Sequence, residues 1–200
     1  MTFERAFDVA LGASAATWAV MRVVSAPPGE RFAAATMTVA LLNLCVAILF
    51  VVRAPAVAGT SPRAVVASLP SVVAAGIALR LAPAPLAWPL GAEIAFAIGG
   101  AVTVVSLATL GRSFAVFPSL RAVITRGPYR LVRHPAYVGE LTMIAGCSAA
   151  RGDALALAVG VAALGAVAAR VVAEERVLAR DEAWAAYATR VRWRIVPGIW

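Results

Sequence analysis

Long apolar runs dominate this sequence and limit the folds that it can adopt. A helix that crosses a bilayer needs about 20 mostly apolar residues, and six stretches approach this length: 6–24, 32–52, 64–81, 86–110, 135–150 and 154–173. Backbone groups inside a bilayer must be paired within their own segment, so such runs predict helices. We therefore expect an all-α polytopic membrane protein with about six transmembrane helices. Pro70 in the third run and the shortness of the fifth leave five or seven crossings as alternatives.

Composition supports lipid as the main solvent of the chain. The 200 residues are 62% hydrophobic and only 14% charged, which is far from the composition of a soluble domain. All 18 basic residues are arginine, and the net charge is +8. Because these arginines alternate with apolar runs, we expect membrane lipids and anionic ligands as partners, and no nucleic acid. The two cysteines lack metal-ligand spacing, so no metal is expected.

Arginine gathers on one side of the predicted helices. Cytoplasmic loops carry an excess of basic residues, and an N-terminus on the inside places fourteen arginines in cytoplasmic segments. These are Arg5, Arg53, Arg63, Arg112, Arg121, Arg126, Arg130, Arg133 and the six from Arg170 onward. The sequence therefore predicts that both termini are cytoplasmic. High alanine and exclusive use of arginine suggest a GC-rich bacterial genome, and hence the bacterial inner membrane.

The last two apolar runs are separated only by residues 151–153, which predicts an antiparallel helical hairpin. After residue 173 the pattern changes, because Val177, Trp184, Tyr187 and Val191 fall on one helical face. This predicts an amphipathic helix at the membrane surface that Pro197 ends. With no repeat or linker in view, residues 1–200 are interpreted as a single membrane domain.

Residues 127–139 bring polar groups to the mouth of a predicted membrane helix. Pro135 is suited to the first turn of that helix, which places Arg133 and His134 at its N-terminal end. Free N–H groups and the helix dipole favour an anion there, such as a carboxylate. The alternative is that the arginines only set topology and that His134 caps the helix. Glu174 and Glu175 favour a site, because acids near a membrane boundary are costly unless paired or functional.

These elements resemble the isoprenylcysteine carboxyl methyltransferase family. The resemblance rests on Gly-Pro-Tyr-Arg-x-x-Arg-His-Pro-x-Tyr-x-Gly at 127–139, a hydrophobic hairpin, the Glu-Glu pair, and then Tyr187, Val191, Arg192 and Pro197. It also includes residues 110–114. Phospholipid methyltransferases share this C-terminal pattern, and some membrane sterol reductases carry a similar Arg-His-Pro-x-Tyr segment. The resemblance implies an S-adenosylmethionine site in a catalytic half, 111–200, with the acceptor side in residues 1–110.

The resemblance also implies roles for individual residues. Cofactor contacts are expected from Arg121, Ala122, Val123, Ile124, Tyr129, His134, Pro135, Ala136, Tyr137 and Glu174. Arg121 stands where eukaryotic members commonly have histidine, so contacts there are expected through the backbone. Arg170 lies one helical turn before Glu174 and is expected to face the methyl acceptor. The alternative for Arg170 is a helix-end arginine that snorkels to the interface.

Three functions fit this sequence. The first is S-adenosylmethionine-dependent methyl transfer to a lipophilic or lipid-modified acceptor, most simply a carboxylate or thiol. The second is a reductase that uses NADPH, and the third is a non-catalytic protein that binds anionic lipid. Glu93 and Glu140 are acids within apolar runs, which makes both functional suspects, Glu140 more than Glu93. The five tryptophans are interpreted as interfacial anchors: Trp18, Trp88, Trp184, Trp193 and Trp200.

Overall fold

Seven α-helices make up most of the computed structural model, which describes residues 3–54, 62–116 and 121–200. No strand occurs within these ranges. The helices are α1 (Phe3–Val24), α2 (Ala34–Val52), α3 (Pro62–Leu81), α4 (Leu90–Leu110), α5 (Pro135–Arg151), α6 (Ala154–Leu178) and α7 (Glu182–Arg190). Each of the six predicted spans is therefore a helix, and the protein is an all-α polytopic membrane protein.

Four of these helices are long and apolar enough to cross a bilayer by length and composition, among the described residues. They are α1, α2, α4 and α6. The apolar part of α3, Val65–Leu81, is shorter, and α5 has 17 residues. Pro70 lies inside α3 without ending it, as membrane helices allow where neighbours satisfy the freed backbone groups.

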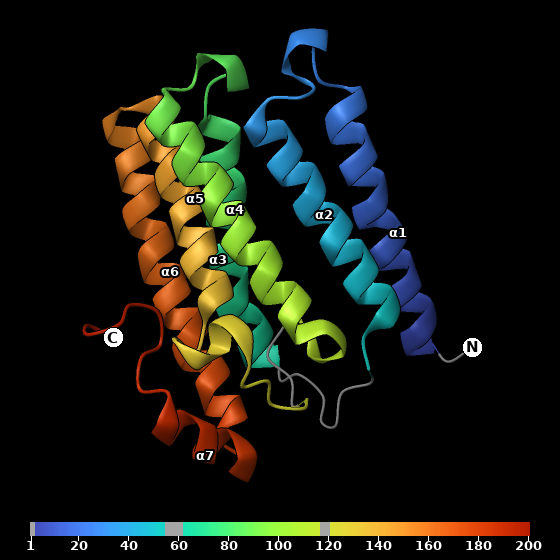
Figure 1. Ribbon diagram of the computed structural model, residues 1–200, viewed down its shortest axis with the longest axis vertical. Coiled ribbons are helices and arrows are strands. Elements are labelled where there is room, and N and C mark those ends of the chain that lie inside the picture. Colours follow the sequence, from blue (N-terminus) through green and yellow to red (C-terminus); the bar gives the residue numbers. More distant parts are fainter. Residues whose placement is uncertain (1–2, 55–61, 117–120) are drawn as a thin grey trace.

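The two chain ends lie at the same end of the molecule but on opposite sides of it, because the helices run alternately up and down (Figure 1). In that view α1 and α2 form one side of the molecule, and α3, α4, α5 and α6 form the other. Helix α4 packs most extensively on α5, α1 packs on α2, and α3 packs on α6. Helices α2, α4 and α6 all end at the end of the molecule where α5 starts (Figure 1). Polar segments far apart in sequence therefore meet at this end.

Glycines bring α4 and α5 into close contact. A side chain on Gly139 would collide with the Thr103 hydroxyl and the Gly99 carbonyl of α4. A Cβ on Gly146 would lie 2.9 Å from the Ala92 carbonyl oxygen. Gly139 belongs to the motif at 127–139, so this packing fixes the helix that carries the motif.

The predicted hairpin between α5 and α6 is confirmed. Gly152 has φ 73°, a left-handed conformation that ends α5 and favours glycine. The Asp153 side chain accepts a hydrogen bond from the Ala156 N–H at 2.8 Å and so caps α6. This N–H bond, and then the Arg151 side chain, keep the pKa of the exposed Asp153 carboxyl below its ordinary value. The turn sets α6 antiparallel to α5.

The C-terminal region differs from the sequence prediction in three ways. Helix α6 continues to Leu178, so Glu174, Glu175 and Val177 lie within it rather than after it. Helix α7 ends at Arg190, before Pro197. The apolar face of α7, formed by Trp184 and Tyr187, packs against Tyr129. The sequence had predicted that this face would lie on the membrane surface. The physical reason is a fold-back: Tyr187 donates a hydrogen bond to the Tyr129 carbonyl at 2.7 Å.

Candidate functional site

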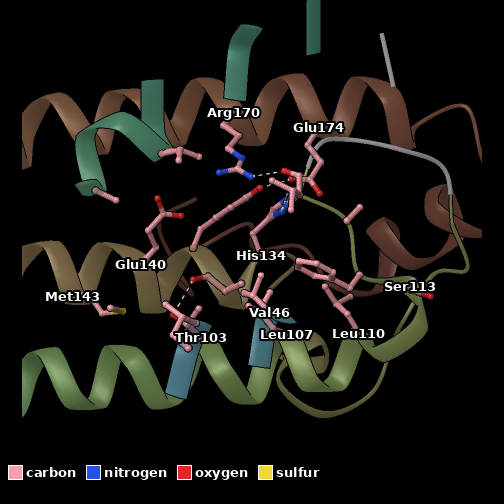
Figure 2. Close-up of a pocket in the computed structure, with 18 of the residues that line it drawn as sticks. Val46, Thr103, Leu107, Leu110, Ser113, His134, Glu140, Met143, Arg170 and Glu174 are labelled. Carbon is pink, nitrogen blue, oxygen red and sulfur yellow. Dashed lines mark hydrogen bonds and ion pairs between the residues drawn. The ribbon is translucent and has the colours of Figure 1, made fainter. Parts of the chain in front are cut away.

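A cavity of about 530 Å³ lies among α2, α3, α4, α5 and α6. Its polar end holds His134, Tyr137, Arg170 and Glu174, which project from the start of α5 and the last turns of α6 (Figure 2). Its deep end is apolar and includes Val39, Phe96, Met143, Ile144 and Cys147. From Tyr137 to Cys147 along α5 is ten residues, or about 15 Å of helix. The cavity can therefore accept a ligand with a polar head and an apolar body.

The structure brings nearly all of the predicted site residues to this one cavity. Its lining includes Arg121, Ala122, Val123, Ile124, Tyr129, His134, Ala136, Tyr137, Arg170 and Glu174. Pro135 is the exception: it is buried as the first residue of α5 and does not line the cavity. Its place in the helix is the one predicted, because proline has no N–H that a first turn would leave unpaired.

Tyr137 and Glu174 join the two helices of the hairpin at the polar end. The Tyr137 hydroxyl donates a hydrogen bond to Glu174 Oε2 at 2.7 Å. The Glu174 side chain is 26% exposed, so part of the carboxylate can still accept hydrogen bonds from a ligand. The His134 ring stacks on Tyr137 with ring centroids 5.6 Å apart. These three side chains form a continuous polar wall.

The backbone at the start of α5 is less available than the sequence suggested. The Arg133 and His134 N–H groups donate to the Trp193 and Arg194 carbonyls, each at 2.9 Å. These two N–H groups, which precede the first residue of α5, are therefore not available to an anion. The physical reason is the fold-back after α7, which pairs residues 193–194 with this turn.

Arg170 is held inside the protein. Its side chain is 8% exposed, and it donates to Ser71 Oγ at 3.0 Å and to the Val116 carbonyl at 2.7 Å. The guanidinium carbon lies 5.0 Å from the centre of the Tyr137 ring, a cation–π arrangement. Its buried Nε has no hydrogen-bond partner among the described residues. The alternative that Arg170 snorkels to the interface is therefore wrong, and its Nε–H is left for a ligand.

Glu175 has a different role from Glu174, which sequence reasoning did not separate. Glu175 Oε1 accepts from Arg133 at 3.0 Å and lies 3.2 Å from His134 Nε2. Glu175 Oε2 accepts from Arg194 at 2.8 Å. Its oxygens are thus occupied by protein groups that hold His134 in place. Two adjacent acids carry no signal in sequence that says which one faces the cavity.

Trp184 is a cavity residue that the sequence did not identify. It is 8% exposed, lines the cavity and lies 6.1 Å from the His134 ring centre. Its interpretation as an interfacial anchor is therefore wrong. The signal was its spacing of three residues from Tyr187, which places both on one helical face.

Glu93 and Glu140, the two acids within apolar runs, have different surroundings. Glu93 Oε1 accepts a hydrogen bond from the Ala34 N–H at 3.2 Å and so caps the start of α2. Glu140 instead lines the cavity. Within the described residues no group of three potential metal ligands is found.

Arg121 and the nearby tyrosines close the polar end. The Arg121 guanidinium donates to the Ala54 carbonyl, which ties the segment after α4 to the end of α2. Burial, with a smaller contribution from the Glu174 charge, raises the pKa of Tyr129 above its ordinary value. Burial also raises the pKa of Tyr187, to about 12. Both hydroxyls therefore stay protonated and polar without charge.

Comparison with known proteins found a family match for the part of the chain that carries most of the polar end of the cavity. Residues 90–181 match the family described as phospholipid methyltransferase. The match begins at the first residue of α4 and includes α5, α6 and most of the polar end of the cavity. A comparison with curated proteins gave no match to the chain.

Proposed function

We propose that this chain, whose residues 90–181 match the family described as phospholipid methyltransferase, is a membrane methyltransferase that transfers a methyl group from S-adenosylmethionine to a lipophilic acceptor. The observation that carries this proposal is a cavity with a polar end, at the mouth of α5, and an apolar end among the helices. Two reactants of opposite polarity fit such a cavity. One is a charged cofactor, and the other is a lipid-like acceptor.

The polar end suits S-adenosylmethionine in the chemistry of its side chains. Glu174 has free capacity to accept from ribose hydroxyls or from an ammonium group. His134 is held through Nε2 by Glu175, while its Nδ1 lies 3.9 Å from Glu174 Oε2, so both groups can contact the same ligand. The segment 121–124 lines the same end and offers backbone contacts to an adenine ring. We assign the cofactor to these groups.

Arg170 is assigned to the acceptor. Methyl transfer from a sulfonium is an in-line displacement, so the protein must mainly orient the two reactants and exclude water. The buried guanidinium, whose Nε–H has no partner among the described residues, can orient an anionic acceptor such as a carboxylate or thiolate. Tyr137 contacts both Arg170 and Glu174, and so lies between the two reactant positions.

The membrane setting follows from the same assignment. An acceptor with a hydrocarbon body reaches the deep end of the cavity through the apolar helices, while the cofactor enters from the basic side. We assign that side to the cytoplasm of a bacterial inner membrane.

Isothermal titration of the detergent-purified protein with S-adenosylmethionine and with NADPH tests the proposal. We expect saturable binding of S-adenosylmethionine and none of NADPH. Binding of NADPH alone would support the reductase alternative. Binding of neither, by a protein that is folded in its thermal melt, would favour a non-catalytic role and overturn the proposal.

A further inference from the structure

Glu140 is a carboxylate that the proposed chemistry leaves without a role. It lies on α5 three residues after Tyr137, or about 4.5 Å further along the helix. It lines the cavity, and Figure 2 shows it projecting from α5 near the space into which Arg170 projects from α6. Its position is therefore beside the acceptor rather than beside the cofactor.

The Glu140 carboxylate forms no hydrogen bond or ion pair with any residue in the described ranges. The other acids of this region do: Glu174 accepts from Tyr137, and Glu175 binds Arg133 and Arg194. Glu93, the other acid in an apolar run, caps α2. The charge of Arg170 acts on Glu140 without a direct contact. A carboxylate inside a membrane protein is costly without a hydrogen-bond partner, so Glu140 has the capacity to accept from a ligand.

The chemistry of a carboxylate limits what that group can be. An ionised carboxylate only accepts hydrogen bonds, whereas the guanidinium of Arg170 only donates them. An anionic group therefore belongs at Arg170, and a group with an N–H or O–H belongs at Glu140. The apolar residues around Glu140, such as Met143 and Ile144, require that this group be attached to a hydrocarbon body.

We propose that Glu140 is a specificity-determining residue that binds a hydrogen-bond donor, an ammonium or hydroxyl group, on the head of a long-chain acceptor. This rests on the proposed function only in taking the deep part of the cavity as the acceptor site. Glu140 should not select a ligand by positive charge alone, because its carboxylate accepts hydrogen bonds from N–H or O–H groups of the ligand.

Four ligands with the same twelve-carbon chain separate the possibilities: dodecylamine, dodecanol, dodecanoate and dodecyltrimethylammonium. Binding is measured by titration in detergent with S-adenosylmethionine present, for the wild-type protein, Glu140→Gln and Glu140→Leu. Glu30→Gln is the matched control, because it removes one acid outside the cavity at the opposite end of the molecule. All variants are first compared by thermal melting.

We expect dodecylamine or dodecanol to bind the wild-type protein and to lose at least about tenfold in affinity in Glu140→Leu. A larger loss for the amine identifies an ammonium head, and a larger loss for the alcohol identifies a hydroxyl head. Dodecanoate should bind Glu140→Leu no more weakly than the wild type, and Glu30→Gln should change nothing.

Three results would overturn the proposal. They are unchanged amine and alcohol binding in Glu140→Leu, no binding of either ligand to the wild type, and equal losses for dodecylamine and dodecyltrimethylammonium, which has no N–H. A parallel loss of S-adenosylmethionine affinity in Glu140→Leu would assign the residue to the cofactor instead. Failure of the wild type to bind S-adenosylmethionine contradicts the proposed function but leaves the ligand comparison in force.

Discussion

Glu174 and Glu175 are neighbours in sequence but meet different surroundings. Glu175 is saturated by Arg133, His134 and Arg194, whereas Glu174 has one protein donor, the Tyr137 hydroxyl. A carboxylate with spare capacity at the polar end is suited to hold a ligand. The two residues should therefore respond differently to substitution.

Glu174→Gln keeps the size of the side chain and removes its charge. A charge-assisted hydrogen bond contributes about 1.5–3 kcal/mol, so we expect S-adenosylmethionine affinity to fall at least about tenfold in isothermal titration. Glu30→Gln should bind like the wild type. Unchanged affinity in both Glu174→Gln and His134→Ala would remove these residues from the cofactor site.

Arg170 is expected to act on turnover more than on cofactor binding. Its three nitrogens have separate roles, because two bind Ser71 and Val116 and Nε is unpaired. Lysine keeps the charge but not the planar fork, so Arg170→Lys should be impaired almost as much as Arg170→Ala. The measurement is transfer of labelled methyl into organic-extractable product, alongside titration with S-adenosylmethionine. A parallel loss of cofactor affinity and turnover in Arg170→Ala would move the residue to the cofactor.

The buried tyrosines make stability depend on alkaline pH. The chain has no lysine, so tyrosine is the main side chain with an ordinary pKa of about 10. Burial raises the pKa of Tyr187 to about 12 and raises that of Tyr129 as well. The folded protein keeps protons that the unfolded chain releases, so stability should fall as pH rises from about 10 to about 12. Thermal melts at stepped pH measure this, and Tyr187→Phe should melt lower at neutral pH but decline less. A wild-type melting temperature that is flat over this interval would contradict the assignment.

At the scale of elements, the contact between α4 and α5 sets the position of the motif helix. A methyl group at Gly139 would overlap the Thr103 hydroxyl and the Gly99 carbonyl, and overpacking of this kind costs about 1–3 kcal/mol. Gly139→Ala should therefore lower the melting temperature in detergent and weaken S-adenosylmethionine binding. Gly165→Ala on α6 is the control, because a Cβ there meets nothing within 4 Å. Equal melting temperatures for the two variants would mean that α4 and α5 are not held this closely.

Apolar length predicted the helices α1 to α6, because a bilayer imposes both length and internal hydrogen bonding on a helix, and four of them are long and apolar enough to cross a bilayer. It did not predict the end of α6, since Glu174 and Glu175 are polar but continue the helix as they find partners across the hairpin. The pairing of 193–194 with the start of α5 was also not predictable. This pairing is made by backbone N–H and carbonyl groups, which the pattern of side chains in the sequence does not reveal. Trp184 was misread because a tryptophan against a cavity and one at an interface look alike in sequence.

At the scale of the whole molecule, the arrangement of polar connections predicts sidedness. The ends of α2, α4 and α6 lie at the end of the molecule that carries the chain termini (Figure 1), and we propose from the arginine distribution that this end faces the cytoplasm. In a variant with Cys45 and Cys147 replaced by alanine, a cysteine at Pro28 should react with an impermeant reagent outside intact cells. A cysteine at Thr125 should react only after the membrane is opened. Labelling of Thr125 from outside would reverse the orientation and place the polar end of the cavity outside the cell.

The pairing of residues 193–194 with Arg133 and His134 has a consequence for biosynthesis. Helices α1 to α6 are synthesised before this segment. Until the segment folds back, the N–H groups of Arg133 and His134 lack their carbonyl partners, and Glu175 lacks Arg194. The polar end of the cavity is therefore completed last, and we expect a released chain that stops before residue 190 to keep α1 to α6 but to bind S-adenosylmethionine more weakly.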